Sequence, residues 1–284
     1  MRIIARQKGL KKYYYLQHSA RKDNRVITKE KYLGTETPKN ISEIQENFAR
    51  ELHEDAYKKF ERIKEHFQAE WAKYPPTVKE KEKEEIAIAF TYNTNAIEGS
   101  TITLQEAHEI IHDKIAPNKP LRDVREAQTH SEVFLEMLDT KKPITKRMLL
   151  EWHKTIFEET KPDVAGLFRD YIVRVGSYRA PDWQDVEQLM NQFVHFVNNT
   201  KIHPVELSAR AHYLFEKIHP FGDGNGRIGR LLMNFILWHY GYPMLIIEYK
   251  KRRSYYKALE KDEHQFTDYF FRRYLSVHKK RILN

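Results

Sequence analysis

The stretch HPFGDGNGRIGR, residues 219–230, is the feature that most constrains the fold of this chain. Apolar residues recur at helical spacing before it, over 207–218, and again after it, over 228–236. We therefore expect a tight loop between two buried helices, with glycines at the start of the second helix. A glycine-rich loop that opens a helix binds anions, because its backbone N–H groups point outward and the helix dipole adds positive potential.

Four side chains of this stretch carry chemistry. Arg227 and Arg230 lie three residues apart, so both should project from one helix face and suit a polyphosphate. Asp223 is an acidic group set among these residues, and we predict that it holds a metal ion that neutralises phosphate oxygens. His219 is the neutral base within reach. A turn, a helix cap or a surface ion pair would explain each residue singly, but their combination favours phosphate-transfer chemistry.

The composition is that of a globular chain, long enough for one large domain or for a core domain with small appendages. It has 284 residues, of which 40% are hydrophobic and 31% charged. It has no cysteine, which excludes disulfides, thiol nucleophiles and cysteine-ligated metals and is compatible with a reducing cytoplasm. Its apolar runs are too short to cross a bilayer, and its basic N-terminus lacks the apolar stretch of a secretory signal. We therefore expect a cytoplasmic protein with no membrane partner.

The first 40 residues are strongly basic, with 11 lysines and arginines against three acidic residues. Residues 13–16 and 26–33 have the composition of two strands, with a turn at 21–24 and a linker at 36–40. The sequence thus predicts a basic β-hairpin appendage. Such an element is either a solvated charged hairpin or a surface for nucleic acid, for an acidic protein or for another copy of the chain.

The rest of the chain is predicted to be helical, apart from a short hairpin or flap at 167–179, where β-branched and polar residues alternate. Helices are expected from residue 41 to the prolines at 75 and 76, and over 78–97, 103–112, 122–139, 145–159 and 185–199, with further helix from residue 205 onward. The fold class is therefore mainly α with two small β elements. We divide it into a basic arm (1–40), a helical N-terminal region (41–140) and a core with C-terminal helices (141–284).

The stretch at 219–230 resembles the signature of the Fic family, HPFx(D/E)GNGRxxR, at every specified position. Two further segments are similar to Fic proteins: VGSYRAPDWQDVEQLM at 175–190 resembles the flap and the helix after it, and RRSYYKAL at 252–259 resembles the segment that closes over the adenosine. The resemblance covers roughly residues 145–275. It implies a Fic (Fido) helical core with a small β-hairpin flap.

The resemblance implies a protein adenylyltransferase, which moves AMP from ATP to a serine, threonine or tyrosine hydroxyl of a target protein. His219 would be the catalytic base, and Asp223 would hold Mg²⁺ or Mn²⁺. The target would dock on the flap at 172–178 as an added strand. The implied nucleotide-binding residues are Val175, Gly176, Ser177, Tyr178, Phe221, Gly224, Asn225, Gly226, Arg227, Arg230, Tyr255 and Tyr256.

A second motif resembles (S/T)xxxE(G/N), which marks Fic proteins that are restrained by a helix of their own. It consists here of Thr94, Glu98 and Gly99, at the end of a predicted helix. The resemblance implies that Glu98 pairs with Arg230 and keeps this arginine from the γ-phosphate of ATP. The regulatory residues would then be these three, with the restraining helix in the region 41–140.

Three other activities stay open at this point. One is transfer of another phosphate-linked group on the same fold, and another is removal of AMP, with Glu98 orienting water. The third is nucleic-acid binding through the basic arm, whose tyrosines could stack on bases. The arm could also mediate self-association into a homo-oligomer.

Overall fold

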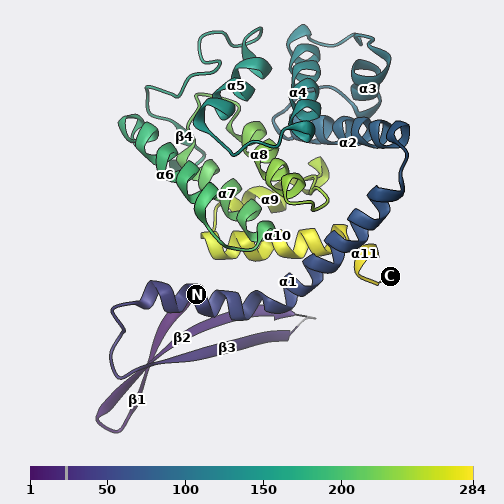
Figure 1. Cartoon of the computed structure of the whole chain (residues 1–284). Helices are drawn as coiled ribbons and strands as arrows, with labels where there is room; N and C mark the ends of the chain where they lie inside the picture. Colours follow the sequence, from purple (N-terminus) through teal and green to yellow (C-terminus); the bar gives the residue numbers. More distant parts are fainter. Residues whose placement is uncertain (23–24, 284) are drawn as a thin grey trace. The chain divides into compact units, whose positions relative to one another are not determined.

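The computed structural model describes residues 1–22 and 25–283. They form two compact units, Met1–Lys59 and Phe60–Asn284, and a ribbon view of both is given in Figure 1. The first half of the long helix groups with the N-terminal strands, and the helices of 76–140 pack with those of the core.

The first unit is a three-stranded antiparallel sheet followed by the first half of helix α1. Its strands are β1 (Arg2–Lys8), β2 (Lys11–Lys22) and β3 (Arg25–Gly34), in the order β1-β2-β3. The expected two-stranded hairpin was therefore incomplete, because β1 precedes it. Strand β1 is mostly exposed and lacks the alternation that marks a half-buried strand. Residues 23–24 of the expected turn lie outside the described residues.

The second unit opens with helices that were predicted closely. Helix α1 (Ile41–Lys73) ends before Pro75 and Pro76, and α2 (Pro76–Ile97) ends at Glu98, followed by Gly99 with a φ of 91°. Helix α3 (Leu104–His108) begins with a capping box, in which Thr103 and Glu106 bond each other's backbone N–H groups. It continues as the π-helix η1 (Glu109–Asp113).

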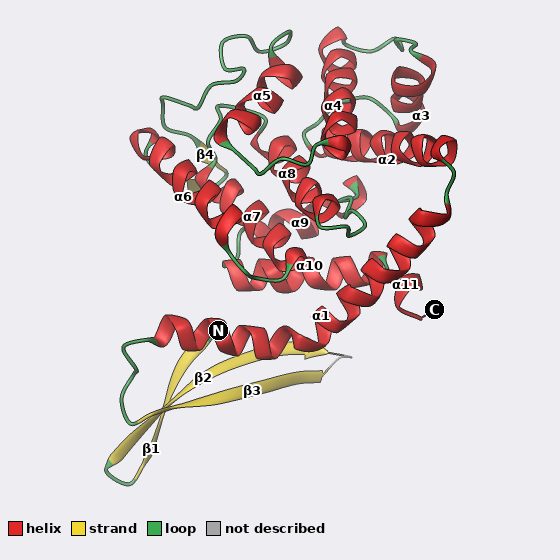
Figure 2. Ribbon diagram, in the orientation of Figure 1, coloured by secondary structure: helices red, strands yellow, loops and turns green. Residues whose placement is uncertain are grey.

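The remaining elements are mostly helical, as Figure 2 shows. They are α4 (Leu121–Asp139), α5 (Lys146–Phe157), β4 (Arg174–Val175), β5 (Tyr178–Arg179), η2 (Trp183–Asp185), α6 (Val186–Asn199), α7 (Pro204–Ile218), α8 (Asn225–His239), η3 (Tyr249–Lys251), α9 (Arg252–Leu259), α10 (Glu263–Val277) and α11 (Lys280–Leu283). The fold class predicted from the sequence, mainly α with small β elements, is confirmed. The flap is shorter than expected, since only four residues of 167–179 pair as strands. No helix among the described residues is both long and apolar enough to span a bilayer.

Helix α8 lies at the centre of the second unit and carries the end of the glycine-rich stretch. It packs against α7, α4, α2 and α5. Every residue from Arg227 to Leu237 is buried, and the aliphatic ones belong to the main hydrophobic core. Because α8 is buried on all sides, its N-terminus has a fixed position. Its first backbone N–H groups can therefore hold a ligand in one place.

Candidate functional site

The loop between α7 and α8 has a tightly specified backbone. Helix α7 ends at His219, a non-glycine residue with a left-handed φ of 51°, and α8 begins after Gly224, which has a φ of 78°. The Asn225 side chain accepts from the N–H of Phe221 and donates to its carbonyl, both at 2.9 Å. These two bonds close the loop into a compact turn. The backbone N–H groups that follow the turn belong to the first turn of α8.

Arg169, which precedes the flap, anchors the His219 end of this loop. Its buried guanidinium donates to the carbonyl of His219 at 2.8 Å and to that of Ile218 at 3.4 Å. The same group donates to the carbonyls of Tyr171, at 2.8 Å, and Pro181, at 2.7 Å, on the two sides of the flap. One side chain therefore fixes both the unusual backbone at His219 and the base of the flap. Sequence reasoning missed this residue.

His153 of α5 holds the other end of the loop. Its Nε2 donates to the carbonyl of Asp223 and its Nδ1 accepts from the N–H of Gly166, each at 2.9 Å. Its ring stacks on Phe221, with centroids 3.9 Å apart. Burial lowers the pKa of His153 to about 4. It therefore stays neutral, which the two bonds require, because a protonated Nδ1 could not accept.

His219 has the tautomer and the charge state of a general base. Its Nδ1 lies 3.3 Å from the carbonyl of Glu216, to which it donates. That bond leaves the lone pair on Nε2. Burial lowers the pKa of His219 below the usual value of a histidine. The ring is thus neutral at physiological pH, and the residue lines a cleft in which a proton donor can approach it.

The cleft has a volume of about 600 Å³ and brings together most of the residues singled out from the sequence. Those that line it are Glu98, Val175, Gly176, Tyr178, His219, Asp223, Gly224, Asn225, Gly226, Arg230, Tyr255 and Tyr256. Ser177, Phe221 and Arg227 do not line it: Phe221 is fully buried under the loop, and Arg227 points to an acidic partner. Further lining residues that the sequence did not indicate include Glu216, Lys217, Leu259 and Glu260.

Glu98 and Arg230 form an ion pair at the edge of the cleft. The Arg230 guanidinium donates to Glu98 Oε1 at 2.7 Å, to Thr94 Oγ1 at 2.7 Å and to the Thr94 carbonyl at 3.1 Å. Arg230 is 1% exposed, whereas the Glu98 side chain is 33% exposed. Burial opposes the charge on Arg230, but Glu98, Tyr255 and Glu216 together outweigh it, and the pKa of Arg230 is raised. A side chain at Gly226 would collide with the Glu98 carboxylate, so the glycine leaves the space that the pair occupies.

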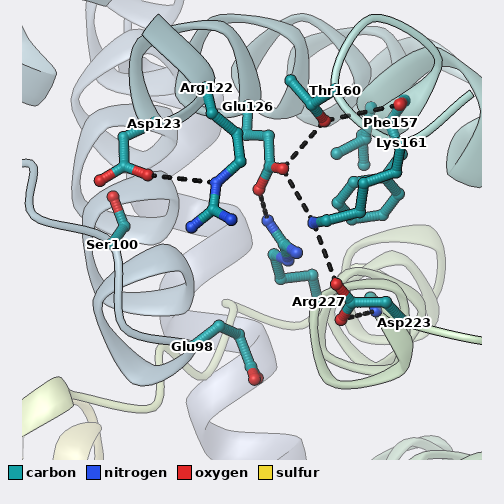
Figure 3. Close-up of polar contacts among 12 residues, drawn as sticks. Glu98, Ser100, Arg122, Asp123, Glu126, Phe157, Thr160, Lys161, Asp223 and Arg227 are labelled. Carbon is teal, nitrogen blue, oxygen red and sulfur yellow. Dashed lines mark hydrogen bonds and ion pairs between the residues drawn. The ribbon is translucent and has the colours of Figure 1, made fainter. Parts of the chain in front are cut away.

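Arg227, Glu126, Lys161 and Asp223 form a continuous chain of charges, drawn in Figure 3. Arg227 pairs with Glu126 of α4, and Lys161 Nζ lies 2.8 Å from Glu126 Oε1 and 3.0 Å from Asp223 Oδ2. Burial raises the pKa of Asp223, but the Lys161 hydrogen bond and charge outweigh it, so the net pKa lies below the usual range. Asp223 is therefore an ionised carboxylate at neutral pH, held by Lys161 and by the N–H of Gly224 at 2.6 Å.

Asp223 and its surroundings fit a metal ion that is held jointly by one carboxylate and by the phosphates of a substrate. Among the residues that the structure describes, no three histidine, aspartate or glutamate side chains cluster so as to hold an ion by themselves. Asp223 is a single carboxylate with a half-exposed side chain, beside an anion-binding helix start. Mg²⁺ in nucleotide sites is commonly held by one or two carboxylates, with substrate phosphates and water as its other ligands.

Glu216 is a buried carboxyl that no motif pointed to. It lines the cleft, and its Oε1 has no hydrogen-bond partner within the described part of the chain. Burial raises the pKa of Glu216 to about 7, although Arg230 acts in the opposite direction. Its position on α7, three residues before His219, is typical of an ordinary exposed helix residue, so only the fold reveals that its carboxyl is buried.

Comparisons with known proteins agree with this geometry. Residues 143–237 match the model of the Fic/DOC family. The curated "Protein adenylyltransferase Fic" of Nematostella vectensis is 35% identical over 181 residues, which cover 61% of this chain and 42% of that protein. The relative of the same name from Aedes aegypti is 33% identical over 191 residues, covering 63% and 37%. The chain thus spans about two fifths of the length of these relatives.

Solved structures show the same fold. A Fic-domain signaling protein of Bacteroides thetaiotaomicron superimposes with a TM-score of 0.69 at 24% identity, covering 79% of this chain and 95% of that one. The Fic-1 protein of C. elegans, residues 134–508, gives a TM-score of 0.71 at 24% identity, covering 86% and 74%. The motif, the family match and the fold thus agree: residues 143–237 match the Fic/DOC family model, and the chain has the fold of the solved Fic structures.

Proposed function

We propose that this protein is an adenylyltransferase that moves AMP from ATP to a hydroxyl of a target protein. One observation carries the proposal: a neutral His219, the backbone N–H groups that open α8 and the guanidinium of Arg230 all face one cleft. A base, an anion-binding helix start and a buried cation are what transfer of a phosphate-linked group requires. The name of the curated relatives, "Protein adenylyltransferase Fic", supports the same activity.

In the proposed reaction His219 removes the proton from the target hydroxyl. The hydroxyl oxygen attacks the α-phosphorus of ATP, and the bond from this phosphorus to the bridging oxygen of pyrophosphate breaks. Pyrophosphate leaves with the bonding pair, and the proton remains on His219 until solvent removes it. The N–H groups of residues 224–226 and the guanidinium of Arg230 hold the phosphates in line for this displacement. Tyr255 and Tyr256 form the wall of the cleft that would enclose the nucleoside.

Asp223 is the residue that would hold Mg²⁺ or Mn²⁺ in this site. When bound, the metal would neutralise phosphate oxygens and so favour departure of pyrophosphate. Asp223 is suited to this because its carboxylate is ionised and already positioned by the N–H of Gly224. Activity should therefore disappear in EDTA and return with either metal.

The proposal includes restraint by Glu98. The carboxylate of Glu98 holds the arginine that would bind the γ-phosphate, and Thr94 fixes the same guanidinium from the side. ATP would then bind with its α-phosphate out of line, and misorientation of this kind costs orders of magnitude in rate. This explains why Thr94 and Glu98 belong to one motif with Gly99, whose left-handed φ ends α2 beside the cleft.

The flap is the proposed docking edge for the target. Val175 in β4 and Ile172 before it are both exposed, at 47% and 56%, although they are β-branched residues. A two-stranded ribbon with an exposed apolar edge can accept an extended peptide as a third strand. Such a strand would bring its hydroxyl beside His219, because Arg169 ties the flap and the histidine together.

The test uses ATP labelled on the α-phosphate, in parallel with ATP labelled on the γ-phosphate. The Glu98→Gly variant is incubated with each labelled ATP in a cell lysate. The proteins are then separated on a gel, and the bands that carry label are identified. AMP transfer predicts bands with the α label only. Bands with the γ label would instead identify a kinase, and this proposal would then be wrong. Release of AMP from a pre-modified protein is measured with the wild type, because Glu98 lines the cleft and could orient water there.

A further inference from the structure

The N-terminal sheet has one face covered by helix and one face that presents aromatic and basic side chains. Lys31, on one face, pairs with Glu51 of α1 at 2.7 Å, and Leu16 beside it is fully buried. Residues that pair directly across an antiparallel ladder lie on the same face, and successive residues of a strand alternate between faces. The pairing register therefore identifies the residues on the face away from α1. We call it the open face; it consists of Arg2, Ile4, Arg6, Lys8, Lys11, Tyr13, Tyr15, Gln17, Glu30 and Tyr32.

Three tyrosines form a cluster on the open face. The ring of Tyr32 lies 5.3 Å from that of Tyr15 and 6.3 Å from that of Tyr13. Tyr32 is 55% exposed, and the guanidinium of Arg6 lies 5.0 Å above the ring of Tyr15. The cluster packs under no helix of its own unit, since α1 covers the other face. Tyr32 is therefore the exposed ring that a ligand can reach first, and Tyr13 and Tyr15 beside it are partly exposed.

The open face carries a net positive charge. The open face has four cations and a single acid, Glu30, which is shared between Arg6 and Gln17. The first half of α1, on the other side of the sheet, carries five acids against three cations. They are Glu43, Glu46, Glu51, Glu54 and Asp55. The open face is thus net positive. The face under α1 carries Lys12, Lys29 and Lys31 as well, so the helical side has no excess of acids.

We propose that the open face binds single-stranded nucleic acid, a function separate from AMP transfer. Tyrosine rings on a sheet surface stack on bases that are not already stacked in a duplex, and neighbouring lysines and arginines pair with the phosphates between those bases. An acidic protein would complement the cations but would leave three clustered tyrosines unexplained. Tyrosine rings and cations lie together on one surface of the sheet, which fits a ligand that alternates bases and phosphates.

The test is fluorescence anisotropy of a labelled 20-nucleotide oligo(dT) with the full-length protein at increasing salt. Binding should weaken with a log–log slope of about −3, since four cations can each contact a phosphate and a single strand gives roughly −0.7 per contact. Replacing Tyr13, Tyr15 and Tyr32 together by alanine should weaken binding by about tenfold or more. Replacing them by phenylalanine should preserve it, because the ring faces remain.

Matched variants separate the open face from overall charge. Arg6→Ala with Lys11→Ala should weaken binding and flatten the salt slope, whereas Lys58→Ala with Lys59→Ala, which removes the same charge from α1, should change neither. Circular dichroism melts establish that each variant is folded. Absence of binding by the wild type, or equal binding by the triple alanine variant, would overturn the proposal. A dimer that dissociates in that variant without any effect of oligo(dT) would assign the face to self-association instead.

Discussion

The ammonium group of Lys161 lies 3.0 Å from the carboxylate of Asp223, so the proposed metal ligand already faces a cation. Lys161 is held there by Glu126, at 2.8 Å, and its own side chain is only 18% exposed. A divalent ion that binds Asp223 must either displace this ammonium or tolerate its repulsion. Lys161 should therefore weaken metal binding in the absence of nucleotide.

Lys161→Met should bind Mn²⁺ severalfold more tightly than the wild type, because the competing charge is gone. Electron paramagnetic resonance of free Mn²⁺ during titration measures this without any turnover. Lys154→Met, on the exposed side of α5, is the control for the same loss of charge and should leave the affinity unchanged. Asp223→Asn should abolish the binding. If Asp223→Asn has no effect, the metal assignment fails; if only Lys161→Met has none, the role of Lys161 fails.

Glu98→Gly should raise the rate of AMP transfer, including transfer onto hydroxyls of the protein itself, because Arg230 is released. Arg230→Ala in the same background should lower the rate again, since the γ-phosphate then lacks its cation. Thr94→Val should give a smaller rise, because it removes the Oγ1 contact and keeps the carboxylate pair. Initial rates with α-labelled ATP measure all three. A rate in Glu98→Gly no higher than in the wild type, across several candidate targets, contradicts the restraint.

His219→Ala should lower transfer by about 10²–10⁴ while ATP binding and folding persist. His195→Ala, an exposed histidine of α6, is the control and should be fully active. The pH profile adds a second measurement. Since burial lowers the pKa of His219, the neutral base persists as pH falls, and the acid limb of kcat at saturating ATP should lie below pH 6.5. An acid limb above pH 7 would argue against His219 as the base.

Arg169→Met should lower kcat far more than it changes the dissociation constant of ATP. The guanidinium contacts backbone atoms of His219 and of the flap rather than the cleft, so its loss misplaces the base and the target edge. A displacement of about 1 Å can cost roughly 10²-fold in rate. Arg169→Lys should restore part of the rate, because one cation can still reach the His219 carbonyl. Equal effects on ATP binding and kcat would indicate general unfolding instead.

Four buried histidines should make the fold sensitive to acid. Burial lowers the pKa of His130 and His212 to about 3 and that of His153 and His278 to about 4. The unfolded chain binds their protons near pH 6.5, so stability is complete above that pH and falls as pH drops toward 4, by at most about 1.4 kcal/mol per pH unit for each group. Melting temperatures between pH 7 and 5 should show this fall. His278→Gln should make it shallower, and a flat profile would contradict the burial argument.

Local sequence patterns were enough to predict most of the helices and the loop that carries the chemistry. The capping box at Thr103 and the turn at Gly99 were readable because their partners lie within a few residues. The strand β1 was not, because its side chains are exposed on both faces and show no alternation. Hydrophobic periodicity arises from burial of one face, so it gives no signal for an element that is exposed on both faces.

The supporting residues of the site could not be predicted in the same way. Arg169, His153 and Glu126 contact the loop and α8 from 50 to 101 positions away in the chain. Each looks like an ordinary polar residue of its own segment. The packing of α4 and α5 against α8 positions Glu126 and His153, and Arg169 reaches the loop from the segment before β4. The sequence also placed Arg227 toward the phosphates, whereas its guanidinium is directed to Glu126, because a buried acid on a neighbouring helix has no local signal.

The small space above Gly226 has a consequence for regulation. If the Glu98 carboxylate and the γ-phosphate of ATP compete for Arg230 there, each molecule is at any moment either restrained or competent, and the observed rate reports the fraction of competent molecules. Such a fraction is sensitive to small energies. While the restrained form dominates, any partner that weakens the Glu98–Arg230 pair by about 1.4 kcal/mol would raise the competent population tenfold. A contact no larger than one hydrogen bond would therefore be enough to turn this protein on.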